Sequence, residues 1–166
     1  MNCRRGLLAI LSVATLVGCQ YDPWAGRFLK HQPAERDVVG PYVVNQASQQ
    51  RSVKLPITGL PLKVDPSARI TLSADHIAEF LNVPNEIEGI QCSVTGHGTW
   101  RLGKNGSFIV VRVQIADKES SERCRQTFTA DYGVELNLYG EKPPYRLHKT
   151  IGDPDSGDAL QFEKRN

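Results

Sequence analysis

The sequence predicts a mainly β protein, an antiparallel barrel or sandwich of about seven to nine short strands with at most one short helix. Two observations carry this prediction. The pair Asn105–Gly106 lies between two strand-like runs, as in a β-hairpin. After it, the apolar residues Ile109, Val111, Val113 and Ile115 alternate with other residues, so one face of this strand is apolar.

The first strands can be placed in order along the chain. Residues 38–45 are mostly apolar and β-branched, and Pro41 suits the start or the edge of a strand because it lacks an N–H. Residues 51–68 hold three prolines and a glycine, which predicts an irregular loop. Residues 69–73 predict a short strand.

The next stretch, residues 74–82, fits two structures. Three of its apolar residues have the i, i+3, i+4 spacing of a helix face, and Ser73 suits an N-cap, which favours a short helix. Asp75–His76 also suits the turn of a hairpin, with a strand following it. The hairpin therefore stays open as the alternative.

The second half of the chain predicts only strands and turns. Asn105–Gly106 can supply the two positive φ angles of a type I′ hairpin turn. Residues 124–140 predict two more strands, and residues 145–151 and 159–164 predict a final pair.

The stretch between this final pair, "IGDPDSGD", contains three aspartates. A calcium EF-hand loop needs glycine at position 6 and glutamate at position 12, but counting from Asp153 these positions hold Asp158 and Lys164. Asp153 and Pro154 suit the first two positions of a β-turn. We therefore predict a turn here, and no metal site.

The N-terminus has the pattern of an export signal. Arg4 and Arg5 precede an uncharged apolar run, residues 6–17, that is too short to span a bilayer. The run ends in "LVGC", which resembles the lipobox of bacterial lipoproteins. The resemblance implies cleavage before Cys19 and attachment of a diacylglyceryl group to its thiol. Gln20 in place of aspartate then implies the outer membrane, on its periplasmic face.

Three segments follow from this interpretation. Residues 1–18 are a lipoprotein signal peptide, residues 19–37 are a lipidated N-terminus and tether, and residues 38–166 are a single β-rich domain. The aromatic residues Tyr21 and Trp24 are unusual in a linker, as is Phe28. They either lie among lipid headgroups or pack back on the domain.

Charge and cysteine usage agree with export. The formal net charge of +2 becomes zero once Arg4 and Arg5 are removed with the signal, so we expect no nucleic-acid partner. Cys3 leaves with the signal and Cys19 carries lipid. The remaining pair, Cys92 and Cys124, predicts a disulfide, with two separate thiols as the alternative.

A second resemblance covers most of residues 37–164. The order of "DVVGPY", "ITLSADH", "GTW", "KPPYRLHKTIGDPDSG" and "LQFEK" resembles a group of uncharacterised bacterial lipoproteins, and "PYRL…IGDPDSG" is its most specific part. The resemblance implies no activity. The stretch "VVGPYVV" is also similar to the first strand of lipocalin-like barrels, with Tyr42 in place of the usual tryptophan.

No motif in the chain predicts catalytic residues, a cofactor or a metal. His97 lies between two glycines and close to Trp100, which makes this pair the candidate binding site, with a tight bend before Trp100 as the alternative. The leading function is therefore non-enzymatic binding, for example of a periplasmic protein by an inhibitor or immunity-type lipoprotein. One alternative is a lipocalin-like carrier with a ligand inside the barrel. The other is a periplasmic hydrolase, which requires His97 close to Asp131 or Asp153.

Overall fold

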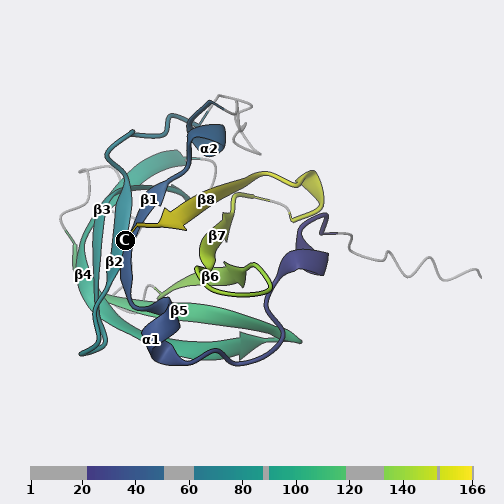
Figure 1. Ribbon diagram of the computed structural model, residues 1–166. Helices are drawn as coiled ribbons and strands as arrows, with labels where there is room; N and C mark the ends of the chain where they lie inside the picture. Colours follow the sequence, from purple (N-terminus) through teal and green to yellow (C-terminus); the bar gives the residue numbers. More distant parts are fainter. Residues whose placement is uncertain (1–21, 51–61, 88–89, 119–132, 153, 166) are drawn as a thin grey trace, which may run out of the picture.

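The computed structural model describes residues 22–50, 62–87, 90–118, 133–152 and 154–165. Eight antiparallel strands form one closed barrel, in which each strand pairs with its neighbours in sequence and β1 pairs with β8 (Figure 1). The predicted barrel is thus confirmed. The strands are β1 Gly40–Val44, β2 Arg69–Leu72, β3 Ile77–Ile87, β4 Ile90–Asn105, β5 Phe108–Lys118, β6 Gly133–Tyr139, β7 Arg146–Thr150 and β8 Ala159–Lys164.

Short helical segments cover the two ends of the barrel. α1 (Glu35–Val38) lies at the end where β1 begins, and α2 (Gln46–Gln50) lies at the end where β1 finishes (Figure 1). Two 3₁₀ turns, η1 (Ala25–Arg27) and η2 (Pro154–Ser156), precede β1 and β8. The described residues therefore contain two helices of about one turn each, where the sequence predicts at most one.

The apolar residues of the strands point into the barrel and pack as one cluster. The predicted row Ile109, Val111, Val113 and Ile115 is buried, with at most 1% of each residue exposed. The other strands contribute further rows by the same alternation, as in β6, where buried and more exposed residues alternate. The cluster also includes Tyr42, Ile70, Leu72, Phe80, Trp100, Leu136, Leu138, Leu147, Leu160 and Phe162.

The β4–β5 hairpin is confirmed, but its turn lies one residue further along than predicted. Asn105 pairs with Phe108, so the two central residues are Gly106 and Ser107. Of the residues from Asn105 to Phe108, only Gly106 has a positive φ, 57°. A glycine with positive φ at the first central position is typical of a type II′ turn rather than the predicted type I′ turn.

The predicted helix at residues 74–82 is wrong, and the alternative hairpin is what the chain forms. The N–H of Ser73 donates to the carbonyl of Ile77 (2.8 Å), and His76 turns the chain with a φ of 65°. β3 then pairs with β2 on one side and β4 on the other. Pairing on both edges satisfies the backbone and buries Phe80, so it overrides the helical spacing.

The aspartate-rich stretch forms the connection between β7 and β8, as predicted. Gly157 has a φ of 68°, and the N–H of Ile151 donates to the carbonyl of Asp158 (2.9 Å) to close the connection. Asp153 lies outside the described residues.

The segment Asp22–Phe28, which we call the strap, lies along the outer face of the barrel. At the α2 end, the indole Nε1 of Trp24 donates to the carbonyl of Gly157 (2.9 Å). At the α1 end, Phe28 forms a β-bridge with Tyr139, and Leu29 enters the apolar cluster. Trp24 and Phe28 thus pack on the domain, one of the two alternatives left open above, although the sequence assigns them to a tether.

The chain after the strap covers the α1 end of the barrel. Val38 is fully buried, and the hydroxyl of Tyr42 donates to its carbonyl (2.6 Å). The Nζ of Lys164 donates to the carbonyl of Asp37 (2.8 Å). Burial lowers the pKa of Lys164, against the opposing effect of the nearby Asp37. These contacts join α1 to both β1 and β8.

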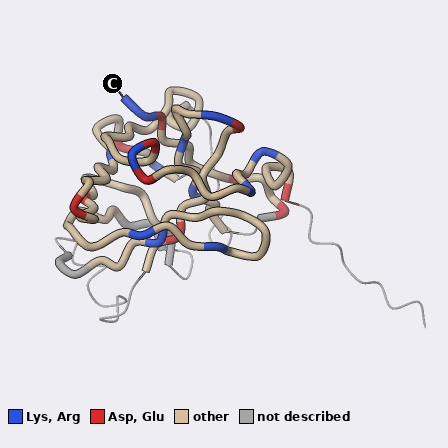
Figure 2. The backbone as a smooth tube through the Cα atoms, turned by 60° about the horizontal axis from the view of Figure 1, so that its bottom comes forward, with Lys and Arg blue, Asp and Glu red and all other residues tan. Residues whose placement is uncertain are grey.

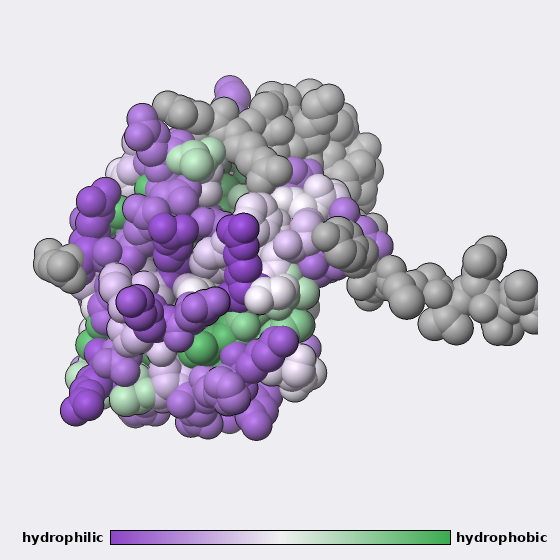
Figure 3. All heavy atoms as spheres, turned by 45° about the vertical axis from the view of Figure 1, so that its right-hand side comes forward, coloured by the Kyte–Doolittle hydropathy of each residue, from purple (hydrophilic) through white to green (hydrophobic). Residues whose placement is uncertain are grey.

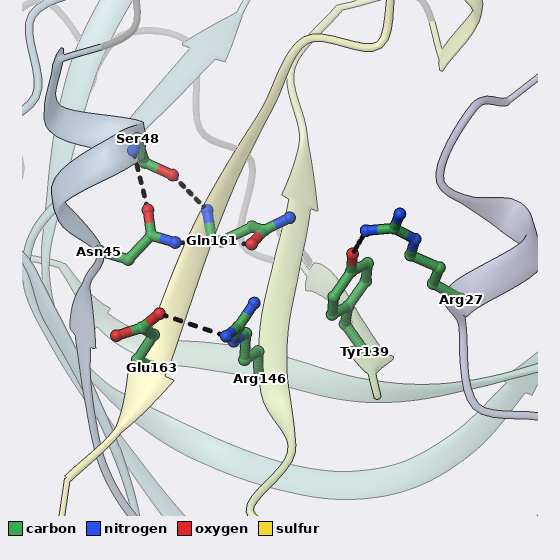
Figure 4. Close-up of polar contacts among 7 residues, drawn as sticks. All are labelled: Arg27, Asn45, Ser48, Tyr139, Arg146, Gln161 and Glu163. Carbon is green, nitrogen blue, oxygen red and sulfur yellow. Dashed lines mark hydrogen bonds and ion pairs between the residues drawn. The ribbon is translucent and has the colours of Figure 1, made fainter. Parts of the chain in front are cut away.

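At the α2 end, a set of polar contacts joins α2 to β8. The side chain of Asn45 accepts a hydrogen bond from the N–H of Ser48 (2.8 Å), which satisfies the first turn of α2. The hydroxyl of Ser48 accepts one from the N–H of Gln161 (2.9 Å) (Figure 4). Contacts at the α1 end and at the α2 end therefore hold β1 and β8 together.

Gly98 is a position where the packing of the barrel admits no side chain. A Cβ there would lie 2.0 Å from the carbonyl oxygen of Gln114 on β5, and backbone cannot move aside as a side chain can. We expect Gly98→Ala to lower the free energy of unfolding by about 3 kcal/mol, measured by urea titration. The matched control is Gly26→Ala, because a Cβ at Gly26 would meet nothing within 4 Å. Equal stability of the two variants would show that β4 and β5 do not approach as described.

Candidate functional site

His97 is exposed on the outer face of β4, in a shallow hollow that crosses β2, β3 and β4. It pairs across the strands with Glu79, which in turn pairs with Thr71. The hollow is lined by Arg69, Thr71, Glu79, Phe80, Leu81, Thr95, Gly96 and His97. Of the two residues predicted to bind, His97 therefore lies on an accessible concave surface.

The shape of this hollow follows from an irregularity in β3. The pairing of β3 with β4 shifts register between Phe80 and Val83, and Asn82 within this interval has a φ of 49°. The hydroxyl of Thr95 accepts the hydrogen bond of the Asn82 N–H (3.0 Å), and the Asn82 side chain donates to the hydroxyl of Ser67 (2.9 Å). Such bulges bend a strand and change the direction of nearby side chains.

The hollow combines several kinds of polar group. Glu79 supplies a carboxylate, Arg69 a guanidinium and His97 an imidazole, and two threonines supply hydroxyls. Such a surface can exchange hydrogen bonds and ion pairs with a polar partner. Because Glu79 and Arg69 are exposed, water screens their charges, so each of these contacts is worth little alone. Binding here would need several contacts at once.

Trp100 lies on the opposite face of β4 from His97. It is 2% exposed, its Nε1 donates to the carbonyl of Ser73 (2.9 Å), and its ring lies 5.2 Å from that of His76. Trp100 is therefore a core residue that fixes the turn between β2 and β3. Three positions separate it from His97, and an odd separation in a strand places side chains on opposite faces. The alternation of side chains between the two faces of a strand is therefore the sequence signal that could have distinguished His97 from Trp100.

Several predicted residues lie outside the described part of the chain. They include Cys19, Cys124, Asp131 and Asp153. Cys92 lies on β4, with its backbone opposite Asn85. The lipid anchor, the disulfide and the His97–aspartate pair of a hydrolase therefore stay predictions. Within the described ranges, no group of three or more histidine, cysteine, aspartate or glutamate side chains is arranged to hold a metal ion.

A second cluster, around His148, was not predicted. His148 is fully buried, although alternation places it on the outer face of β7, next to the inward Leu147. Its ring stacks on Tyr139 of β6, with 5.9 Å between ring centroids, and contacts the rings of Trp24 (5.4 Å) and Phe28 (4.9 Å) of the strap. Burial lowers the pKa of His148 to about 4, and the weaker effect of Asp22 opposes this shift.

The arginine side chains beside this cluster hold Tyr139 from both sides. The guanidinium of Arg27 donates to the Tyr139 hydroxyl (2.8 Å) (Figure 4). This bond raises the pKa of Arg27 above its ordinary value. Arg146 lies 6.0 Å from the centre of the Tyr139 ring and 3.6 Å from the carboxylate of Glu163. The His148 cluster thus joins the strap to β6, β7 and β8 through residues far apart in sequence, which is why local patterns miss it.

Charges of both signs are spread over the outside of the barrel. In Figure 2, lysine, arginine, aspartate and glutamate positions are mixed along the described chain rather than gathered by sign. The face in Figure 3 is mainly hydrophilic, with small hydrophobic areas between the polar side chains. The outer surface therefore offers mixed polar contacts.

No known protein family, curated protein or solved structure matches this chain. Among the helices of the described residues, none is long and apolar enough to cross a membrane.

The hydrogen bond from Asn82 to Thr95 gives a test of how the hollow is built. Thr95→Val keeps the shape of the side chain but leaves the Asn82 N–H without its acceptor. We expect the free energy of unfolding to fall by about 1–2 kcal/mol in a urea titration. The control is Thr99→Val, at an exposed position on the same strand, with an expected change within about 0.5 kcal/mol. If Thr95→Val were as harmless as Thr99→Val, the bond would not be holding the bulge.

Proposed function

We propose that this chain is a lipid-anchored protein of the bacterial envelope, and that its barrel is a non-enzymatic binding module that contacts a partner through its outer face. The anchor rests on the lipobox-like "LVGC" and the apolar run before it, with Cys19 as the lipidated residue on the periplasmic face of the outer membrane. An inhibitor or immunity-type lipoprotein that binds a periplasmic protein fits this description.

The observation that carries the binding role is the division of the barrel into an apolar inside and a polar outside. The inward rows of the described strands pack together in one cluster. Groups that can form hydrogen bonds with a partner lie outside, where the hollow around His97 gathers a carboxylate, a guanidinium and hydroxyls. This favours recognition of a polar protein surface. The alternative, a lipocalin-like carrier, would instead require room for a ligand inside the barrel.

The strap limits how far the proposed anchor can lie from the barrel. Asp22 begins the part of the chain that packs on the barrel, and its carboxylate accepts the N–H of Trp24 (2.8 Å). Two residues separate it from Cys19, so the three Cα–Cα steps between them reach roughly 11 Å when extended. A lipidated Cys19 would therefore hold the barrel close to the membrane surface, on the side of the β7–β8 connection.

Replacing Cys19 tests the anchor. Cys19→Ala removes the thiol that would carry the lipid, so we expect the protein to leave the membrane fraction and to lose incorporation of labelled palmitate. Cys3→Ala is the matched control, because Cys3 lies in the segment that would be cleaved away. Membrane fractionation of Cys19→Ala that matches Cys3→Ala would refute the lipobox interpretation.

Position-specific photo-cross-linking tests the binding face. A photoreactive amino acid at position 97 should give a discrete cross-linked species with an envelope protein in intact cells. The control position is Glu163 on β8, which lies four strands away from β4 in the closed order of the barrel. Equal or absent cross-linking at the two positions would count against a partner at the His97 hollow.

A further inference from the structure

His148 is a buried imidazole whose hydrogen-bonding capacity is not used. Both ring nitrogens are buried and have no hydrogen-bond partner among the described residues. Most buried polar groups in proteins are paired, and leaving one unpaired destabilises the arrangement that buries it. An exception of this kind therefore requires an explanation.

The strap is what buries this ring. On the outer face of a bare barrel, His148 would meet water, but Trp24 and Phe28 cover it with contacts of 5.4 and 4.9 Å between ring centroids. The barrel supplies the ring of Tyr139, stacked at 5.9 Å, and the cross-strand neighbours Asn137 and Gln161. The covered state of His148 is thus the docked state of the strap.

The charged and titratable groups around the His148 ring do not stabilise a protonated imidazole as water would. Asp22 and Arg27 come from the strap, Tyr139 from β6, Arg146 from β7 and Glu163 from β8. Asp22 favours the protonated ring, but more weakly than burial opposes it. Arg27 donates to the Tyr139 hydroxyl, and Arg146 lies near the Tyr139 ring and Glu163.

We propose that His148 and the strap form an acid-sensitive latch: a proton on the imidazole releases Asp22–Phe28 from the outer face of the barrel. An imidazolium carries a charge that needs water or hydrogen-bond acceptors, and the docked strap provides neither. Release exposes the ring. The barrel stays closed, because His148 lies on its outer face, next to the inward Leu147. Leu29, which belongs to the apolar cluster inside the barrel, stays in place and is the point about which the strap moves.

The sign and size of the effect follow from the two states of the ring. Burial lowers the pKa of His148 from 6.5 to about 4 in the docked state, and an exposed ring keeps the ordinary value. Docking is therefore strongest at neutral pH and weakens as the pH falls from about 6.5 towards 4. Between pH 7.5 and 5.5 the docking equilibrium should weaken about tenfold.

For a lipid-anchored chain, the latch would set the distance between barrel and membrane. With the strap docked, three Cα–Cα steps join Cys19 to Asp22, a reach of roughly 11 Å. With the strap released, ten Cα–Cα steps join Cys19 to Leu29, a reach of roughly 36 Å. This consequence rests on the anchor proposed above, whereas the latch itself does not.

The two tryptophans of the chain offer a direct comparison. Each indole N–H donates to a backbone carbonyl over 2.9 Å, Trp24 from the strap to Gly157 and Trp100 inside the barrel to Ser73. Hydrogen exchange of both indoles can be followed by NMR in the full chain carrying Cys19→Ala. The ratio of the Trp24 rate to the Trp100 rate removes the common effect of pH on exchange chemistry. We expect this ratio to rise about tenfold from pH 7.5 to pH 5.5.

Variants of His148 complete the test. His148→Phe places an aromatic ring there that cannot be protonated, so the ratio of the Trp24 to the Trp100 exchange rate should stay constant with pH. The Trp100 signal reports whether this variant folds. If it does not fold, His148→Leu takes its place. His31→Gln, at an exposed position, should behave as wild type, and so should His76→Asn, which removes the imidazole beside Trp100. A constant ratio in the wild type, or the same rise without His148, would overturn the latch. Either result is independent of whether Cys19 carries lipid.

Discussion

The pairing of β1 with β8 is the interaction on which the rest of the structure depends. Only three residue pairs form this seam: Tyr42 with Lys164, Val43 with Glu163, and Val44 with Phe162. Without it, both strands would expose unpaired N–H and C=O groups, and the inward rows would lose their neighbours. Tyr42 is fully buried at the seam, and this burial raises the pKa of its hydroxyl. The same hydroxyl donates to Val38, so closure of the sheet and capping of the α1 end support each other.

Closure also decides where recognition can occur. A barrel whose inside is filled by apolar side chains has its outer face and its loops available for contact. Two local features of the outer face matter here. One is the bulge of β3 that shapes the hollow around His97, and the other is the strap over β6 and β7. The hollow lies on β2, β3 and β4, and the strap lies on β6 and β7, which are on different sides of the closed barrel. A partner at the hollow and a moving strap would therefore not compete for the same surface.

How much of this could be predicted depends on how local each signal is. The β4–β5 hairpin and the inward row from Ile109 to Ile115 were predicted correctly, because a turn residue and strict alternation are local features. The helix at residues 74–82 was wrong, because pairing on both edges of β3 outweighs the spacing of three apolar residues. His148 was missed because the rings that cover it come from residues more than a hundred positions earlier. Trp100, predicted to bind together with His97, lies on the opposite face of β4 because alternation separates the two, and a binding role for His97 stays a prediction.

The most direct test of this account is an NMR measurement of contacts across the seam in the full chain. A closed barrel should give cross-strand nuclear Overhauser effects between residues 42–44 and residues 162–164, as strong as those between β2 and β3. The barrel would then be closed, with its apolar rows inside and its polar groups available outside. Strong effects between β2 and β3 with none between β1 and β8 would show an open sheet, and would contradict both the packed interior and the argument for binding on the outer face.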